Sequence, residues 1–363
     1  MSGIASTVSA SSAASEKKNI RIFVASGTFV APKAGTYKFW ALAAGASGGA
    51  RHNCSVGGAT GGGGGELRIG EVALTAGQSV LITIGAGGAA VTDSTAGNVG
   101  GDTTISSPVS ITAKGGSAGA TIGTSTTTNG GAGGTGGTGG TFSADGGRGG
   151  TFTQTSGTNI FATGGGAAGS IWGAGGHGGD ITGTGITAQS GGGAVGVVPA
   201  MTVTTSAAGT GAGVGGTGSL GTPGPNWQGH TAAYEYVYGQ LVTGMYNGFT
   251  TPYGATMYIG PMLRNPLAEF YGGSSPGGAS QGYSGTGAGG GAYNNPTTTH
   301  YGATGGTCGG GGAAMITTVA GGTANGGRGG RGAGGAAAVT AFSNSGYDFS
   351  GAGGDGLAVV EWD

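Results

Sequence analysis

The sequence predicts a mainly β protein with extensive irregular and polyglycine II structure. In this class a β-sandwich, closed by N- and C-terminal strands, carries a glycine-rich bundle of polyproline-II-type helices. Three observations predict it. Glycine accounts for 98 of the 363 residues. Many glycines stand in GGx runs with a period of three, which is the period of the polyproline II helix. Short segments of alternating apolar residues, typical of β-strands, occur in the first hundred residues and again at the end of the sequence.

The glycine runs are clearest at residues 130–141 (GGAGGTGGTGGT), 146–151 (GGRGGT), 175–180 (GGHGGD) and 326–331 (GGRGGR). A three-residue helix makes no internal hydrogen bonds, so its N–H and C=O groups all need outside partners. Where two of every three positions lack a side chain, neighbouring helices can approach closely and bond laterally. The third-position side chains are expected to point out of the bundle: Ala132, Thr135, Thr138, Arg148 and His177.

Disorder and collagen explain the glycine content less well. Ordering glycine costs much conformational entropy, but only 7% of the residues are charged and 36% are hydrophobic, unlike a disordered chain. Collagen needs glycine at every third position over long stretches and abundant proline, whereas this chain has 10 prolines. A fibroin-like sheet remains an alternative explanation of the glycine content, although its sequence would repeat every two residues and not every three.

The predicted strands lie on both sides of the glycine-rich middle. An alternation of Ile20, Ile22 and Val24 begins the first strand, and a turn at 31–35 separates it from the second. The expected strands that follow are 37–44, 66–74, 79–85, 103–105 and 109–113, with 356–362 as the last. Because the final run is apolar, we expect it to pair with one of the early strands.

Composition divides the chain into six segments. They are an N-terminal tail ordered by a partner (1–19), the sandwich strands (20–114), the polyglycine II bundle (115–222), an aromatic-rich insertion (223–284), a continuation of the bundle (285–350) and the closing strand (351–363). The few large side chains of the bundle are expected to seal its ends or pack on its flank: Phe142, Phe152, Ile160, Phe161, Ile171, Trp172 and Ile181.

Charge and targeting signals exclude several classes of function. A net charge of −1 with scattered basic residues argues against a nucleic-acid partner, including an RGG-like role for Arg148, Arg328 and Arg331. No apolar run has membrane-spanning length, so no membrane insertion is expected. The first residues lack the pattern of a secretory signal, which predicts assembly in a cytoplasm. Cys54 and Cys308 are expected to be free buried thiols, with a single disulfide as the alternative.

The sequence predicts no enzyme, no cofactor and no metal site. Residues 45–49 (GASGG) match a nucleophile-elbow pattern, but glycine this frequent produces such matches by chance. The histidines have no metal-ligand spacing, and His52 beside Cys54 is more often incidental than a metal pair. Turn formation beside glycine runs explains most of the aspartates: Asp93, Asp102, Asp145, Asp180 and Asp355.

Several pieces of the sequence recur in one order in a known family. They are GTFVAPKAGTYKFWALAAGASGG, GGGGGELRIGEVALTAGQSVLITIGAGGAA, GNVGGDTTI and GGDGLAVVEW. Over roughly residues 27–114 and 351–363 the chain resembles the glycine-rich domain of bacteriophage tail fibre and tail tip proteins. The resemblance implies a virion protein at the host-contacting end of the tail, with a polyglycine II bundle whose loops bind the bacterial surface. It implies as partners other phage tail proteins and a surface receptor, either a glycan or an outer-membrane protein.

The aromatic insertion departs from that family pattern. Ten of the 12 tyrosines fall between Tyr234 and Tyr301. Their rings could stack on sugars or grip a surface protein, or instead form a small core or an interface with another virion protein. The candidate contact residues are Trp227, Tyr234, Tyr236, Tyr238, Tyr246, Phe249, Tyr253 and Tyr258.

The expected function is therefore a virion adhesin that displays receptor-binding loops rigidly. The alternative is a decoration or connector protein that docks through the aromatic insertion, and an ice-binding protein is a remote third. Whether the chain forms a homo-oligomer stays open.

Overall fold

The computed structural model describes residues 19–193 and 299–363, except for 125, 157–158, 171–172, 185–186, 303, 306–307, 317–320 and 342–346. Between 194 and 298 it describes only short strands. These are β16 (Thr202–Val203), β17 (Gly209–Thr210), β18 (Ser219–Leu220), β19 (Glu235–Val237), β20 (Gln240–Val242), β21 (Gly248–Thr250) and β22 (Thr256–Tyr258). Every helix or strand in the described part of the chain is a β-strand, which confirms the mainly β prediction.

A five-stranded antiparallel sheet joins the two ends of the described chain. Its order is β1 (Asn19–Phe23), β28 (Leu357–Trp362), β3 (Gly35–Leu42), β6 (Leu67–Leu74) and β11 (Phe142–Ala144). Val359 of β28 is aligned with Ile22 on one side and with Trp40 on the other. The expected pairing of the last strand with an early strand is thus confirmed, and β28 pairs with two of them.

A four-stranded antiparallel sheet lies beside the first. Its order is β2 (Gly27–Val30), β7 (Ser79–Thr83), β8 (Thr103–Ile105) and β9 (Ile111–Ala113). The expected strands at 79–85, 103–105 and 109–113 are all present in this sheet, with slightly different bounds. Burial alternates along β7, where Val80 and Ile82 are buried and Leu81 is exposed, so only one face of this sheet packs inward.

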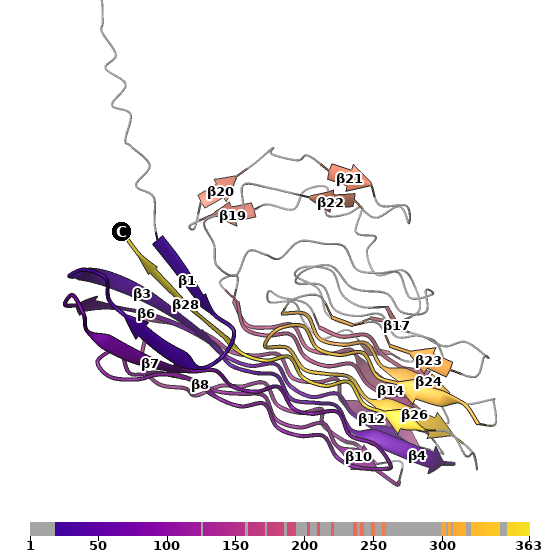
Figure 1. Cartoon of the computed structure of the whole chain (residues 1–363). Coiled ribbons are helices and arrows are strands. Elements are labelled where there is room, and N and C mark those ends of the chain that lie inside the picture. The colour runs from indigo at the N-terminus through magenta and orange to yellow at the C-terminus, as the bar shows by residue number, and fades with distance from the viewer. Residues whose placement is uncertain are drawn as a thin grey trace, which may run out of the picture.

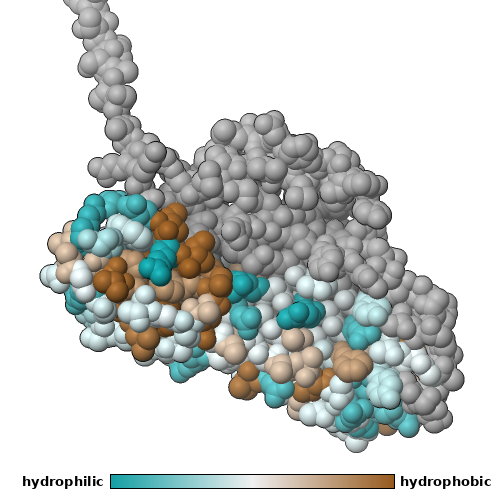
Figure 2. All heavy atoms as spheres, viewed as in Figure 1, coloured by the Kyte–Doolittle hydropathy of each residue, from teal (hydrophilic) through white to brown (hydrophobic). Residues whose placement is uncertain are grey.

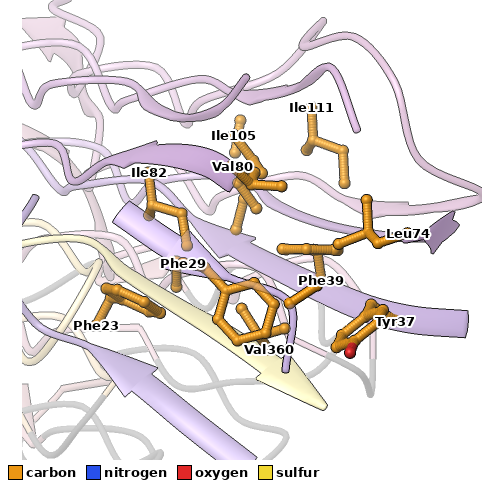
Figure 3. Close-up of a cluster of buried hydrophobic side chains, with 14 of the residues drawn as sticks. Phe23, Phe29, Tyr37, Phe39, Leu74, Val80, Ile82, Ile105, Ile111 and Val360 are labelled. Atoms are coloured by element: carbon orange, nitrogen blue, oxygen red, sulfur yellow. The ribbon is translucent and has the colours of Figure 1, made fainter. Parts of the chain in front are cut away.

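One hydrophobic cluster takes side chains from both sheets (Figure 3). Phe29 of β2 packs edge-on against Tyr37 and Phe39 of β3, with ring centroids 5.5 and 6.0 Å apart. Trp362 of β28 adds a third ring 5.4 Å from Phe29. The Tyr37 hydroxyl donates to the backbone oxygen of Lys33 at 2.7 Å, which satisfies the polar atom of a fully buried ring. We call these two sheets the sheet end.

Glycine-rich segments run side by side away from the sheet end (Figure 1). The segment 61–65 is the best example, because its backbone bonds to six others: 332–335, 117, 147, 166–169, 131–134 and 46. Successive amides point in different directions, since Gly62, Gly63 and Gly64 donate to Gly335, Ser117 and Gly147. We call these mutually bonded segments the tract array.

The hydrogen bonds of the tract array repeat every three residues. Gly62 and Gly65 both donate to the segment 332–335, and they both accept from the segment 166–169. Gly61 and Gly64 both accept from the segment 131–134. A pleated strand instead alternates its backbone groups with a period of two.

Glycine is required in the array because the backbones lie too close for a side chain. A Cβ atom added to Gly63 would lie 1.9 Å from the carbonyl oxygen of Ala132, and one added to Gly64 would lie 2.0 Å from that of Ala167. The outer segment 130–141 follows the predicted orientation, since Ala132, Thr135 and Thr138 are exposed.

The array ends in short, mostly parallel strands, which we call the far end (Figure 1). One sheet contains β10 (Thr121–Ile122), β5 (Gly57–Ala59), β13 (Ile160–Ala162) and β15 (Thr187–Gln189), and another contains β12 (Phe152–Ser156), β14 (Asp180–Thr184) and β16. A third contains β24 (Ala314–Ile316), β26 (Ala338–Ala341) and β4 (Ala50–Cys54), and a fourth β23 (Thr299–Tyr301), β25 (Thr323–Asn325) and β27 (Asp348–Phe349).

Candidate functional site

Most of the predicted aromatic contact residues fall outside the described residues. Trp227, Tyr234, Tyr238, Tyr246 and Tyr253 are among these. The backbones of the other three lie in two antiparallel strand pairs: Tyr236 in β19 is aligned with Leu241 of β20, and Phe249 and Tyr258 lie in β21 and β22. The predicted contact surface therefore stays a prediction.

Buried polar side chains supply partners for backbone groups in the tract array. The Thr163 hydroxyl donates to the Gly150 oxygen at 2.7 Å and accepts from the Gly61 amide at 3.0 Å. Glu66 is fully buried, and its Oε2 accepts from the Lys114 and Gly137 amides at 3.0 Å each. Its other oxygen accepts from Arg68 Nε at 2.7 Å. The hydrogen bonds of Thr163 and Glu66 therefore stabilise the array.

Three of the predicted turn aspartates bind backbone amides beside glycine segments. Asp102 accepts from Gly115 at 2.9 Å, Asp180 from Thr151 at 2.7 Å, and Asp355 from Gly87 at 2.8 Å. Partial burial opposes ionisation of Asp102, but hydrogen bonds from Lys114 and Gly115 outweigh it and lower its pKa. Structural hydrogen bonding accounts for these three carboxylates.

Arg148 and His177 are less exposed than the sequence predicts. Both are half-buried, because Arg148 makes a two-pronged ion pair with Asp180 and its backbone amide donates to His177 Nδ1 at 3.0 Å. Burial lowers the pKa of His177, and the charge of Arg148 lowers it further. Both side chains stay partly exposed, and this polar cluster explains why they are less exposed than side chains that point freely out of the bundle.

Four of the large side chains of the middle segment lie at the far end, and Phe142 lies at the sheet end. Phe152 and Phe161 stack with centroids 4.0 Å apart and an interplanar angle of 6°, and they pack with Ile181 and Ala188. Ile160 is buried in a neighbouring cluster, whereas Phe142 in β11 is 37% exposed. Residues 171 and 172, which carry the same prediction, lie outside the described part of the chain.

The two cysteines are free and buried, as the sequence predicts. Burial raises the pKa of Cys54 to about 11 and that of Cys308 to about 12. The Cys54 thiol lies 3.7 Å from the Thr340 oxygen, so the weak thiol hydrogen bond goes to backbone. These are structural residues and not reactive thiols.

One cluster of titratable residues was not predicted. His52, Asp93 and Asp348 each offer a ligand atom, and these atoms all lie within 4.8 Å of one another. From the sequence, His52 was weighed as a metal ligand only together with Cys54, and Asp93 was interpreted as a turn residue. No local pattern could reveal the cluster, because its three members come from segments that are far apart in the sequence.

Exposed apolar side chains occur on both sheets of the sheet end, and Figure 2 shows hydrophobic surface in this region. Ile22 and Val24 are 45% and 61% exposed, and Val30 and Leu81 are 49% and 54% exposed. Val30 and Leu81 lie on the face of their sheet that points away from buried Phe29 and Val80. Ile22 is aligned with Val359 on the other outer face, so these residues do not form one patch, and exposed apolar residues of this kind are ordinary.

Comparisons of the chain with protein-family models and with curated proteins found no match. Among the described residues, none forms a helix with the length and hydrophobicity needed to cross a bilayer.

Proposed function

We propose that this chain is a non-enzymatic structural protein of a bacteriophage virion, at the tail tip or the end of a tail fibre. There it would act as an adhesin, displaying loops that bind a receptor on the bacterial surface. The ordered sequence pieces in residues 27–114 and 351–363 support the family. The hydrogen bonding of segment 61–65 to six neighbours is the observation that carries the mechanism.

Two finer features of the fold belong to this proposal. We infer that the tract array is a polyglycine II bundle, because its hydrogen bonds repeat every three residues and point in several directions. We also infer that the two sheets of the sheet end form a β-sandwich, because Phe29, Tyr37 and Ile82 share one buried cluster.

Stiffness is the physical advantage of such an array for an adhesin. A loop that is already ordered loses little conformational entropy when it binds, so more of the contact energy remains as affinity. Glycine segments without long side chains supply that order through backbone hydrogen bonds. Aromatic residues of the insertion, such as Tyr236, Phe249 and Tyr258, suit the contact itself because they offer large rigid surfaces.

Competition for cells tests the adhesin proposal. Purified chain is added to host bacteria before the phage that carries it, and free phage is counted after adsorption. An adhesin should reduce adsorption in a dose-dependent way, and the triple variant Tyr236→Ala, Phe249→Ala, Tyr258→Ala should lose this effect. The control is Phe142→Ala, a partly exposed ring of the sheet end. No competition at saturating chain would contradict the proposal.

A decoration or connector protein is the second candidate. This candidate rests on the sequence prediction that the aromatic insertion docks to another virion subunit, and exposed Val30 and Leu81 offer a small apolar contact on the outer face of β2 and β7. A connector should bind virions that lack it and should not compete for cells. An adhesin attached to the tail through the sheet end should do both.

A further inference from the structure

Three segments that are distant in sequence meet at the far end around one group of side chains. His52 belongs to β4, Asp348 begins β27, and Asp93 lies in the loop 91–95. The His52 Nδ1 and Asp348 Oδ1 atoms are 3.1 Å apart, and the Asp93 ligand atom is within 4.8 Å of both. In Figure 1, β4 points toward the far end of the molecule.

Asp348 is the unusual member of this group because its carboxylate is buried without adequate compensation. Its side chain is 0% exposed, and neither carboxylate oxygen has a hydrogen-bond partner in the described residues. A buried carboxylate in this position needs a cation or a proton.

The His52 ring alone does not meet that need. Its Nδ1 lies 3.1 Å from Asp348 Oδ1 and also 3.1 Å from the Thr340 hydroxyl. If Nδ1 carries the proton, the two oxygens share it, and if the Thr340 hydroxyl donates to Nδ1, Asp348 receives no hydrogen from the ring. The second oxygen of Asp348 gains nothing from this contact. Asp93 meanwhile brings another negative charge to the same place, so even a protonated imidazole leaves the group of three with a net negative charge.

The loop that carries Asp93 is held on both sides. The Val91 amide donates to the Ser350 hydroxyl at 2.9 Å, and the Ser350 amide donates to the Val91 oxygen at 2.9 Å. On the other side the His52 amide donates to the Ser94 hydroxyl at 3.1 Å. Asp93 itself has a left-handed φ of 56°. Hydrogen bonds therefore hold the three ligand residues in place before any ion binds.

The donor set selects the class of ion. An imidazole nitrogen with two carboxylate oxygens suits zinc and similar transition metals, whereas calcium and magnesium prefer oxygen ligands alone. Three protein donors are also fewer than the four of a structural zinc site, so water or an outside ligand can complete the coordination. Solvent can reach the site because Asp93 is exposed and the His52 side chain is 28% exposed.

We propose that His52, Asp93 and Asp348 bind one divalent transition-metal ion of the zinc class at the far end of the molecule. This proposal departs from the sequence prediction of no metal site. It does not depend on the proposed virion function.

Metal titration of the complete, tag-free chain tests the site. The chain is stripped with chelator and titrated with Zn²⁺ by calorimetry and with Co²⁺ by visible absorption, which reports coordination by the protein directly. The variants are His52→Gln, Asp93→Asn and Asp348→Asn, each close in size to the original residue. The control is Asp145→Asn, an exposed aspartate of another segment. Far-UV circular dichroism checks that every variant is folded.

We expect one equivalent of Zn²⁺ or Co²⁺ to bind the original chain and the control alike. Each ligand variant should weaken binding by at least about 10-fold, since even supporting residues of metal sites have effects of that size. Zinc should also raise the midpoint of thermal unfolding of the original chain, and chelator should reverse the rise. If Asp348→Asn does not fold, the His52→Gln and Asp93→Asn variants, whose positions are accessible to solvent, test whether these residues bind the metal.

Three results would overturn the proposal. One is the absence of binding by the original chain. Another is equal binding by the original chain and by folded His52→Gln and Asp93→Asn variants. The last is tighter binding of Ca²⁺ than of Zn²⁺, because it would contradict the ion class that the imidazole selects.

Discussion

A single methyl group added at Gly64 should destabilise the whole tract array. A Cβ atom there would lie 2.0 Å from the Ala167 oxygen, 2.4 Å from the Ala167 carbon and 2.9 Å from the Ala168 nitrogen. All three are backbone atoms, so no side-chain rotation can relieve the overlap. The segments must move apart, and Gly64 is bonded to two others, because its amide donates to Gly147 and its oxygen accepts from Gly134.

The expected cost of Gly64→Ala follows from these contacts. Overpacking a dense interior costs about 1–3 kcal/mol. Each buried backbone group that loses its partner adds about 1–3 kcal/mol, and two hydrogen bonds of Gly64 are at risk. We therefore expect the free energy of unfolding to fall by at least about 3 kcal/mol.

Two other glycines provide controls. Gly35 in β3 has nothing within 4 Å of an added Cβ, so Gly35→Ala should be neutral or stabilise by up to about 1 kcal/mol. Gly136 also has free space but a φ of 74°, so Gly136→Ala isolates backbone strain, at about 1 kcal/mol.

Denaturant unfolding, followed by circular dichroism and tryptophan fluorescence, measures all three. If Gly64→Ala unfolds at the same denaturant concentration as Gly35→Ala, backbone contact at Gly64 does not limit the stability of the tract array.

Two further predictions concern buried polar groups. Glu66→Ala should lower the free energy of unfolding by about 3 kcal/mol, because it leaves Arg68 and the partly buried Lys114 and Gly137 amides without their acceptor. The exposed Glu71→Ala should change it by less than about 0.5 kcal/mol. Similar midpoints for both variants would contradict this. Burial raises the pKa of both Cys308 and Cys54 and keeps their thiols protonated and covered, so neither should react with a disulfide reagent until guanidinium unfolds the chain. Prompt labelling of the folded chain would contradict this.

Most strands of the sheet end were predictable because they carry a local signal. β11 was missed, since it lies in the segment predicted as bundle, and the one strand predicted before the turn at 31–35 is two strands, β1 and β2, in different sheets. Residues 79–85 (SVLITIG) follow a turn at 76–78 and are rich in strand-forming residues, and the apolar run at 356–362 indicated a strand that pairs with the early ones. Strand order was less accessible, since nothing local says that β28 lies between β1 and β3.

The strands of the far end could not be predicted from local patterns. β4 (ARHNC) and β26 (AVTA) are short, and their pairing aligns Ala50 with Ala338. Such strands depend on which glycine segments lie next to each other. The same limit applies to His52, Asp93 and Asp348, whose proximity depends on three separate segments and on no spacing within any of them.

The expectation that every third side chain of a glycine run points out of the bundle held only at the surface of the array. Ala132 and Thr135 are exposed in an outer segment, whereas Ala167 and Ala336 are fully buried between segments. An inner segment has neighbours on all sides, so its third position must be small. Whether a segment is inner or outer is a property of the packing, which the period of three does not encode.

The central position of β28 has a consequence for biosynthesis. Of all the described elements, β28 leaves the ribosome last, yet it separates β1 from β3 in the sheet. The first strands must therefore wait, unpaired on that side, while the glycine segments are made. A chain that stops before Leu357 lacks the middle of its sheet, so copies shortened by a nonsense codon or a broken message should fail to mature and should be kept out of any assembly that requires the folded form.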